Sequence, residues 1–357
     1  MLDTGYNIQH NLIASKQASK QASKQASKRE YWIDFLKGTM ILLVVLGHCS
    51  IPSILHIPIY MFHMPIFFVI SGYLYDDKGE GIIEFIKRKS KSLLYPYFVL
   101  GSLIIVYNTA VAVVSGHNSA TEVLKRIAAL IYGNYIWNNN ASYIGVLWFV
   151  VALFCSEIIY YIAIHLHGKR RTVFTVAVVA VGTGISVLNM YEKFRLPWCL
   201  DIACIAFLFF FVGEFIRKHP ISILRGIMSM IFGFILGISN SLVMKVLSFN
   251  MIREDMLYMN YGILPLFLAS ASLISIGFIT LVKALYQTKK YIFIEHLGRD
   301  SLLIMVIHLY VIQLVGKITE NWILKYVIAC AVSIVLAFIV EKHLPTLYKI
   351  PHNNMKN

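Results

Sequence analysis

Lys37 and His48 stand eleven positions apart inside the first long apolar stretch of the chain. At ~100° per residue this spacing is about three helical turns, so both side chains would lie on one face, roughly 16 Å apart in height. A charged side chain inside a membrane costs ~2.5–3.5 kcal/mol and therefore marks function by default. An imidazole can take a proton from a hydroxyl, and an ammonium can attract an anion. The pair predicts a polar path with a base at one end and a cation at the other.

Each member of this pair also has a structural interpretation. Lys37 could be a lysine near the helix end whose ammonium reaches the membrane surface. His48 could simply bond to a backbone carbonyl. Asp34 precedes Lys37 by one turn and is expected to pair with it. The occurrence of both groups on one face of so apolar a helix favours the functional interpretation.

The second apolar stretch carries His63, Pro65 and Ser71. A tight turn near Pro58 should bring His63 to a depth similar to that of His48. Pro65 frees the carbonyl of Met61, which must then find another partner. A histidine pair in one polar pocket and a structural role for His63 are both compatible with this pattern.

A basic segment lies just before the third apolar stretch. Its cations could bind phosphate groups, or they could anchor the helix at the cytoplasmic surface. The residues concerned are Lys87, Arg88, Lys89 and Lys91.

Later apolar stretches contain a further set of polar or aromatic candidates for substrate contact. These are Trp148, Glu157, Asp201, Ser301 and His308. For each of them, hydrogen bonding between helices explains the residue as well as ligand contact does.

The composition shows what must position these residues. The chain is 58% hydrophobic and only 14% charged, with a mean hydropathy of +0.69. Soluble domains are about 45–50% apolar, so the composition predicts a membrane protein.

The net charge of +14 is expected for positive cytoplasmic loops, and no basic helix alternates with exposed aromatics, so nucleic-acid binding is not expected. The five cysteines lack metal-ligand spacing, and neither a metal site nor a disulfide framework is predicted.

We predict an all-α polytopic fold of about ten transmembrane helices with both termini in the cytoplasm. Each apolar stretch is near the ~20 residues that cross a bilayer. Lys and Arg are about three times more frequent in the segments that this arrangement places inside. The expected spans are 35–55, 57–75, 93–115, 143–164, 172–190, 198–216, 222–243, 261–284, 300–316 and 322–341.

The membrane domain is expected over residues 31–345, between a tail at 1–30 and a cytoplasmic tail at 346–357. Ala14 to Lys28 repeats the tetrapeptide ASKQ, which has no large apolar side chain and should be disordered or loosely helical. The genetic code allows this repeat to be written as a tandem tetranucleotide. Gain or loss of one unit would shift the reading frame, which gives the hypothesis of phase-variable expression. The alternative is a basic tail that enforces orientation, and the codons of the gene would decide between them.

In sequence order, these segments resemble acyltransferase family 3 of integral-membrane acyltransferases, in particular its fucose O-acetylase-like branch. The resemblance covers about residues 30–341. It rests on a basic residue and a histidine with ten residues between them, on an HMPxFFxxSGY segment, on LWF, on LPWxLD followed by FFxxG, and on GxxSL followed by His. Here these are Lys37 and His48, His63–Tyr73, Leu147–Phe149, Leu196–Asp201 with Gly213, and Leu297–Leu302 with His308. Where the family often has an Arg-x-x-Arg pair before the third span, this chain is Lys-rich.

The resemblance implies O-acyl transfer, with acetyl-CoA entering from the cytoplasm as a donor substrate and no permanently bound cofactor. The acceptor would be a hydroxyl of a cell-envelope carbohydrate such as lipopolysaccharide, capsule or exopolysaccharide, at a bacterial inner membrane. His48 would be the general base. His63 and His308 would orient it or stabilise the oxyanion, and an acyl-histidine intermediate stays open. Lys37, with Arg88 and its neighbours, would attract the CoA anion.

A polytopic transporter or exporter of a glycan or small solute is the alternative. Spans interrupted by Pro and Gly and containing buried charges also suit transport. Inverted repeats between the two halves would favour that function, and none is evident in the sequence.

Overall fold

The computed structural model describes residues 30–116, 120–133, 145–192, 194–249, 251–288 and 291–344. Over these ranges all regular elements are helices, apart from an isolated bridge between Asp255 and Asn260. The predicted all-α membrane fold is confirmed. Among the described residues, seven helices are long and apolar enough to cross a membrane, or up to nine if each bent pair forms one span. About ten spans and cytoplasmic termini stay predictions, and both tails lie outside the described residues, apart from Glu30.

The chain forms its helices in the following order. They are α2 (Tyr31–Gly47), α3 (Ser53–Phe62), α4 (Pro65–Tyr73), α5 (Ile82–Lys89), the π-helical turn η1 (Ser90–Leu94), α6 (Tyr95–Val114), α7 (Ala120–Tyr132), the 3-10 turn η2 (Gly145–Leu147), α8 (Trp148–His165), α9 (Gly168–Glu192), the 3-10 turn η3 (Pro197–Cys199), α10 (Leu200–Ala206), α11 (Leu208–Lys218), α12 (Ile223–Val246), α13 (Leu264–Thr288), α14 (Ile292–Arg299), α15 (Ser301–Gly316) and α16 (Trp322–His343).

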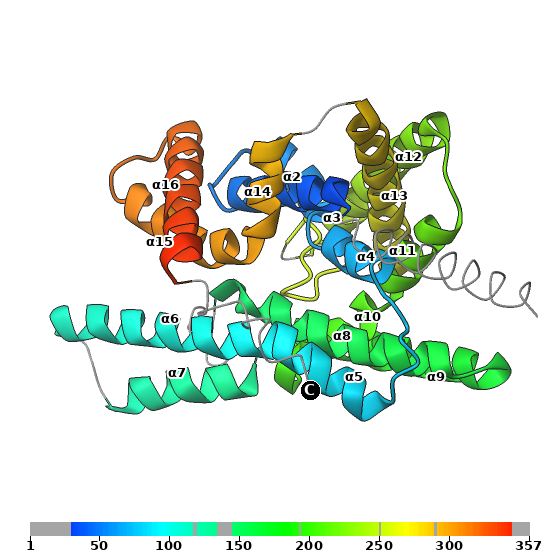
Figure 1. The fold of residues 1–357 in the computed structure, drawn as a ribbon, viewed down its shortest axis with the longest axis horizontal. Coiled ribbons are helices and arrows are strands. Elements are labelled where there is room, and N and C mark those ends of the chain that lie inside the picture. Colours follow the sequence, from blue (N-terminus) through cyan, green and yellow to red (C-terminus); the bar gives the residue numbers. More distant parts are fainter. Residues whose placement is uncertain are drawn as a thin grey trace, which may run out of the picture.

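Helix α2 occupies the centre of the bundle. It contacts α3, α13, α14, α15 and α16. In Figure 1 the pair α12–α13 and the pair α15–α16 stand on opposite sides of it, while α6, α8 and α9 run across the other half of the molecule. Leu36, Met40 and Val45 of α2 are fully buried. A helix apolar on all sides is expected to be enclosed in this way.

The predicted first span, 35–55, is longer than the helix that the structure contains. Helix α2 ends at Gly47, and His48 is its C-terminal cap. The N–H of His48 bonds to the carbonyl of Val45 and that of Cys49 to Leu46, so the last turn is tightened. Ser50 then has a φ of 57° and Pro52 follows, which together turn the chain into α3.

Two helix pairs among the described residues, each of which could form one span, are bent. Helices α10 and α11, which overlap the predicted span 198–216, meet at 45°, and α14 meets α15 at 80°. Only α15 was expected as part of the ninth span, 300–316. The residues on both sides of each bend are apolar. Hydropathy indicates burial in lipid or protein and does not report the direction of a helix, so it could not predict these bends.

Glycines bring several of these helices into backbone contact. A Cβ on Gly298 of α14 would collide with the Asp34 carbonyl of α2, and one on Gly38 would collide with the Ile294 carbonyl. Helices α4 and α11 approach each other in the same way, since a Cβ on Gly213 would collide with the backbone of Val69 and Tyr73. Such small-residue contacts are typical of helix packing in membranes.

We therefore predict that Gly213→Ala destabilises the protein by about 1–3 kcal/mol, because the added methyl forces the α4 and α11 backbones apart. Gly184→Ala in α9 is the matched control, since a Cβ there meets nothing within 4 Å. It should be neutral or stabilising by about 0.5–1 kcal/mol. Thermal unfolding of the detergent-purified proteins measures both. Equal melting temperatures for the two variants would contradict the close-contact interpretation.

Candidate functional site

One face of α2 lines two neighbouring cavities. Lys37 and Ile41 line a cavity of about 170 Å³, which we call the lysine cavity. Val44 and His48 line a cavity of about 210 Å³, which we call the histidine cavity. Met305 of α15 lines both. The two titratable side chains therefore project toward adjoining spaces, roughly 16 Å apart along the helix.

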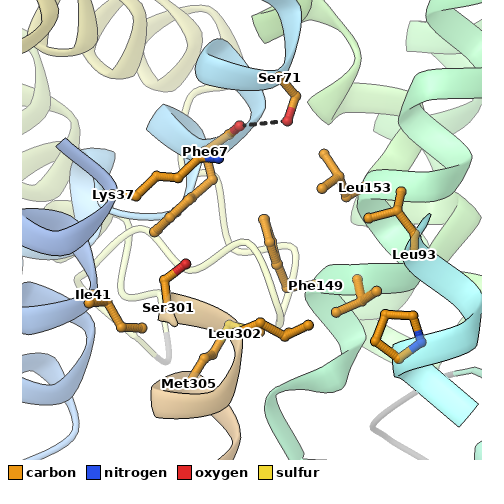
Figure 2. Close-up of a pocket in the computed structure, with 12 residues that line it drawn as sticks. Lys37, Ile41, Phe67, Ser71, Leu93, Phe149, Leu153, Ser301, Leu302 and Met305 are labelled. Atoms are coloured by element: carbon orange, nitrogen blue, oxygen red, sulfur yellow. Dashed lines mark hydrogen bonds between the residues drawn. The ribbon is translucent and has the colours of Figure 1, made fainter. Parts of the chain in front are cut away.

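The lysine cavity is mainly apolar. Figure 2 shows Lys37 and Ser301 projecting into it from α2 and α15, opposite Phe149 and Leu153 of α8. Ser71 of α4 also faces it, and its hydroxyl donates to the Phe67 carbonyl at 3.0 Å. A narrow apolar space with one cation and two hydroxyls suits a slender, partly polar ligand.

His48 and His63 line the histidine cavity, and His308 of α15 lies against His48. The ring centroids of His48 and His308 are 5.2 Å apart. The Nδ1 of His308 lies 3.2 Å from the Ile304 carbonyl, and the Nδ1 of His63 lies 2.8 Å from the Ile59 carbonyl. Since a carbonyl can only accept, Nδ1 carries a proton in both rings, and in the neutral form of each ring Nε2 is left as an acceptor. The Nε2 of His308 has no protein partner among the described residues.

The segment between α12 and α13, residues 251–263, closes the histidine cavity; we call it the closing loop. It contributes Arg253, Asp255 and Tyr258 to the lining, with Met256 and Leu257. Backbone bonds at 2.9 Å in both directions join Asp255 to Asn260. The Asn260 amide donates to the carbonyls of Met251 and Arg253 at 2.9 and 2.6 Å. The loop is thus fixed by its own hydrogen bonds.

Neighbouring helices and the segment before α10 hold the closing loop from outside. Arg195, in that segment, forms a buried ion pair with Asp201 at 2.6 Å and also donates to the Leu257 carbonyl at 2.6 Å. Ser186 of α9 donates to the Met259 carbonyl at 2.8 Å. Asp201 therefore acts on the cavity through the position of the loop, and it does not line either cavity itself.

Carboxylates pair with two members of the basic segment. Arg88 forms an ion pair with Glu80, which holds the pKa of the Glu80 carboxyl below its ordinary value. Lys89 pairs with the buried Glu157 of α8 at 2.7 Å. Lys87 and Lys91 are exposed. Two of the four cations predicted to bind the donor are thus exposed, and the other two are paired with carboxylates, while the donor site stays a prediction.

The π-helical turn η1 contains Lys91, the last cation of the basic segment, and leads into α6. Leu93 of this turn and Pro96 after it line the lysine cavity. Single π turns are frequent at functional sites, because the extra residue changes the direction of the side chains that follow. Here the turn places the basic segment next to the cavity that contains Lys37.

The acyltransferase-domain family matches residues 30–342 of the chain. The chain belongs to acyltransferase family 3. The resemblance stated from the sequence motifs is confirmed at the family level.

One curated relative of this chain is the nodulation protein NolL of Mesorhizobium japonicum, which is 26% identical to it over 194 residues. The match covers 51% of this chain and 48% of NolL, so the chain spans about half the length of the curated relative that it matches. No solved structure matches the chain.

Apart from the basic segment, the predicted site residues divide into two groups. The cavities bring together Lys37, Ser301, His48, His63 and Trp148 as lining residues, with His308 against His48. Asp34, Glu157 and Asp201 are buried outside the two linings.

Sequence analysis missed the closing loop. Arg253, Asp255 and Tyr60 line the histidine cavity, and none of them was a candidate. The available signal was the run Arg253-Glu254-Asp255, a group of charges between two long apolar spans.

Glu254 is a fully buried carboxyl at the base of the closing loop. The Asn240 amide of α12 donates to its Oε1 at 2.6 Å, and no cation pairs with it among the described residues. Burial raises the pKa of Glu254 from 4.5 to about 8, although the bond from Asn240 acts against that rise. The protonated form is therefore favoured in the folded state.

The sign of the resulting pH dependence follows from proton binding. Between pH 4.5 and about 8 the folded state holds a proton that the unfolded state has lost, so stability falls as the pH rises through this range. The total effect is on the order of a few kcal/mol. We predict that Glu254→Gln flattens the fall in melting temperature between pH 5 and 8, measured on detergent-purified protein. An unchanged slope in this variant would show that other groups cause the dependence.

Proposed function

We propose that the chain is an O-acyltransferase that moves an acyl group, most simply acetyl, from acyl-CoA to a hydroxyl of a cell-envelope glycan such as lipopolysaccharide, capsule or exopolysaccharide. The observation that carries this proposal is the face of α2, where Lys37 and His48 line adjoining cavities. Membership of acyltransferase family 3 supports it. In this proposal the protein acts in a bacterial inner membrane.

The donor would approach from the end of the protein that bears Lys37. The exposed Lys87 and Lys91 and the cavity-lining Lys37 supply positive charge for the phosphates of CoA. The apolar lysine cavity then fits the thin arm that carries the thioester. The roughly 16 Å from Lys37 to His48, from the helix rise, matches a ligand that extends from a basic surface to a buried base.

In the chemical step, His48 would remove the proton of the acceptor hydroxyl as its oxygen attacks the thioester carbonyl. A C–O bond forms, the C–S bond breaks, and the thiolate of CoA leaves and takes a proton. General-base catalysis of this kind contributes about 10²–10⁴-fold. His308, 5.2 Å away between ring centroids, would orient the His48 ring, and His63 would support the oxyanion.

The first prediction for this function uses labelled acetyl-CoA and membranes that contain the protein. Label should appear on the glycan with the wild type, and His48→Ala should lower the rate by about 10²–10⁴-fold because the base is lost. His219→Ala is the matched control: it removes an exposed histidine whose ring lies at the Phe215 carbonyl and outside the linings of both cavities.

Membrane insertion of each variant is checked by its amount in the membrane fraction. Full activity in His48→Ala would reject the base assignment. If no label reaches glycan with the wild type, while the glycan or a solute crosses the membrane only when the protein is present, the transporter is the better account.

The role of Lys37 is tested by charge. We predict that Lys37→Arg retains most activity, whereas Lys37→Glu raises the KM for acetyl-CoA at least tenfold, because a carboxylate repels the phosphates at the donor cavity. The effect should weaken as salt concentration rises. Similar KM values for the two variants would show that Lys37 does not attract the donor.

A further inference from the structure

The closing loop presents two opposite charges to the histidine cavity. Arg253 and Asp255 line the same space as His48, at the far end of the α2 face from Lys37. The mechanism above uses neither of them. Both are held in place before any ligand arrives, and this pre-organisation lowers the cost of binding.

Arg253 has spare hydrogen-bond donors. Its guanidinium lies over the Tyr60 ring, 4.6 Å from the centroid, and its Nη2 is 3.3 Å from Oδ2 of Asp255. Its Nε is buried and has no protein partner among the described residues. A guanidinium carries five N–H donors in a fixed plane, so most remain for a ligand.

Asp255 supplies the matching acceptor. Its Oδ1 accepts from the backbone N–H of Leu257 at 3.1 Å and of Tyr258 at 3.4 Å, which fixes the side chain on the turn. Its Oδ2 faces Arg253 and is the oxygen that a ligand can share. Burial raises the pKa of Asp255, while the Arg253 cation and these two backbone bonds act against that rise.

Aromatic side chains complete the lining. Tyr60, Trp148 and Tyr258 surround the pair of charges and the two histidines His48 and His63. A sugar ring offers C–H groups that pack on aromatic faces, and neighbouring hydroxyls that both donate and accept. The Arg253–Asp255 pair offers both complements at once, and its charges cancel. Phosphate groups of the donor would instead require an excess of positive charge.

We propose that Arg253 and Asp255 form the acceptor-recognition subsite, which selects an uncharged glycosyl unit with neighbouring hydroxyls and directs one hydroxyl toward His48. This inference rests on the proposed transfer to a glycan. To that function the inference adds a class of acceptor, an uncharged glycosyl unit, and the two residues that would recognise it. An acidic sugar would bring a second anion beside Asp255 and is disfavoured.

The experiment measures initial rates of label transfer from acetyl-CoA to isolated envelope polysaccharide by purified protein. Arg253→Gln and Asp255→Asn should each raise the KM for the polysaccharide about tenfold or more, the usual effect of losing a charged hydrogen bond. The KM for acetyl-CoA should change less than twofold. Asp255→Asn keeps the Oδ1 acceptor of the turn. Arg225→Gln, at an exposed position in α12, is the control and should leave both constants unchanged.

A second arm tests the charge of the acceptor. The same polysaccharide, with its carboxyl groups chemically reduced to alcohols, should be acetylated as well as the untreated material. Loss of transfer after reduction, unchanged polysaccharide KM in both variants, or a selective rise in the acetyl-CoA KM would each overturn the subsite. If Arg253→Gln fails to fold, Arg253→Lys is the substitute. It keeps the positive charge but loses the planar set of guanidinium N–H donors, and it should still raise the polysaccharide KM. Absence of label on glycan with the wild type would instead refute the proposed function.

Discussion

The structure depends on one constraint: the polar stripe of α2 has to be kept away from lipid. A lysine exposed to lipid costs up to about 2.5–3.5 kcal/mol, the value at the centre of a span, and an imidazole that meets only hydrocarbon loses its hydrogen bonds. Five other helices contact α2, so its stripe faces protein cavities. The glycine contact between α14 and α2 allows this enclosure, because a side chain at Gly298 would hold the two backbones apart. The helices that pack around α2 therefore also form the cavities that its polar side chains line.

A second consequence of this enclosure is that buried carboxylates require cationic partners to stay ionised. Three buried carboxylates are each paired with a cation: Glu157 with Lys89, Asp201 with Arg195, and Asp255 with Arg253. In a low-dielectric setting, such pairs limit the cost of burial. They also set positions, since Arg195 holds both Asp201 and the carbonyl of Leu257 in the closing loop. Buried ion pairs outside the cavities thus shape the cavity that the loop covers.

The sequence predicted those features that depend on the geometry or hydropathy of a single helix. The helical spacing of Lys37 and His48 gives their common face, and hydropathy places the long apolar segments. It was less informative where the answer depends on segments far apart in the chain. The pairing of Lys89 with Glu157 joins residues 68 positions apart, and no local pattern in the sequence indicates it. The closing loop was missed because no periodicity describes a segment held by side chain to backbone bonds. The end of α2 at Gly47 reflects a local turn that apolar composition does not report.

Met305 determines what lies between the two cavities. It lines both of them and is itself buried. A thioether has no hydrogen-bond donor and is only a weak acceptor, so it offers water no strong partner at the boundary between the two cavities. Because the side chain is unbranched and has three rotatable bonds, it can also fit ligands of different shape.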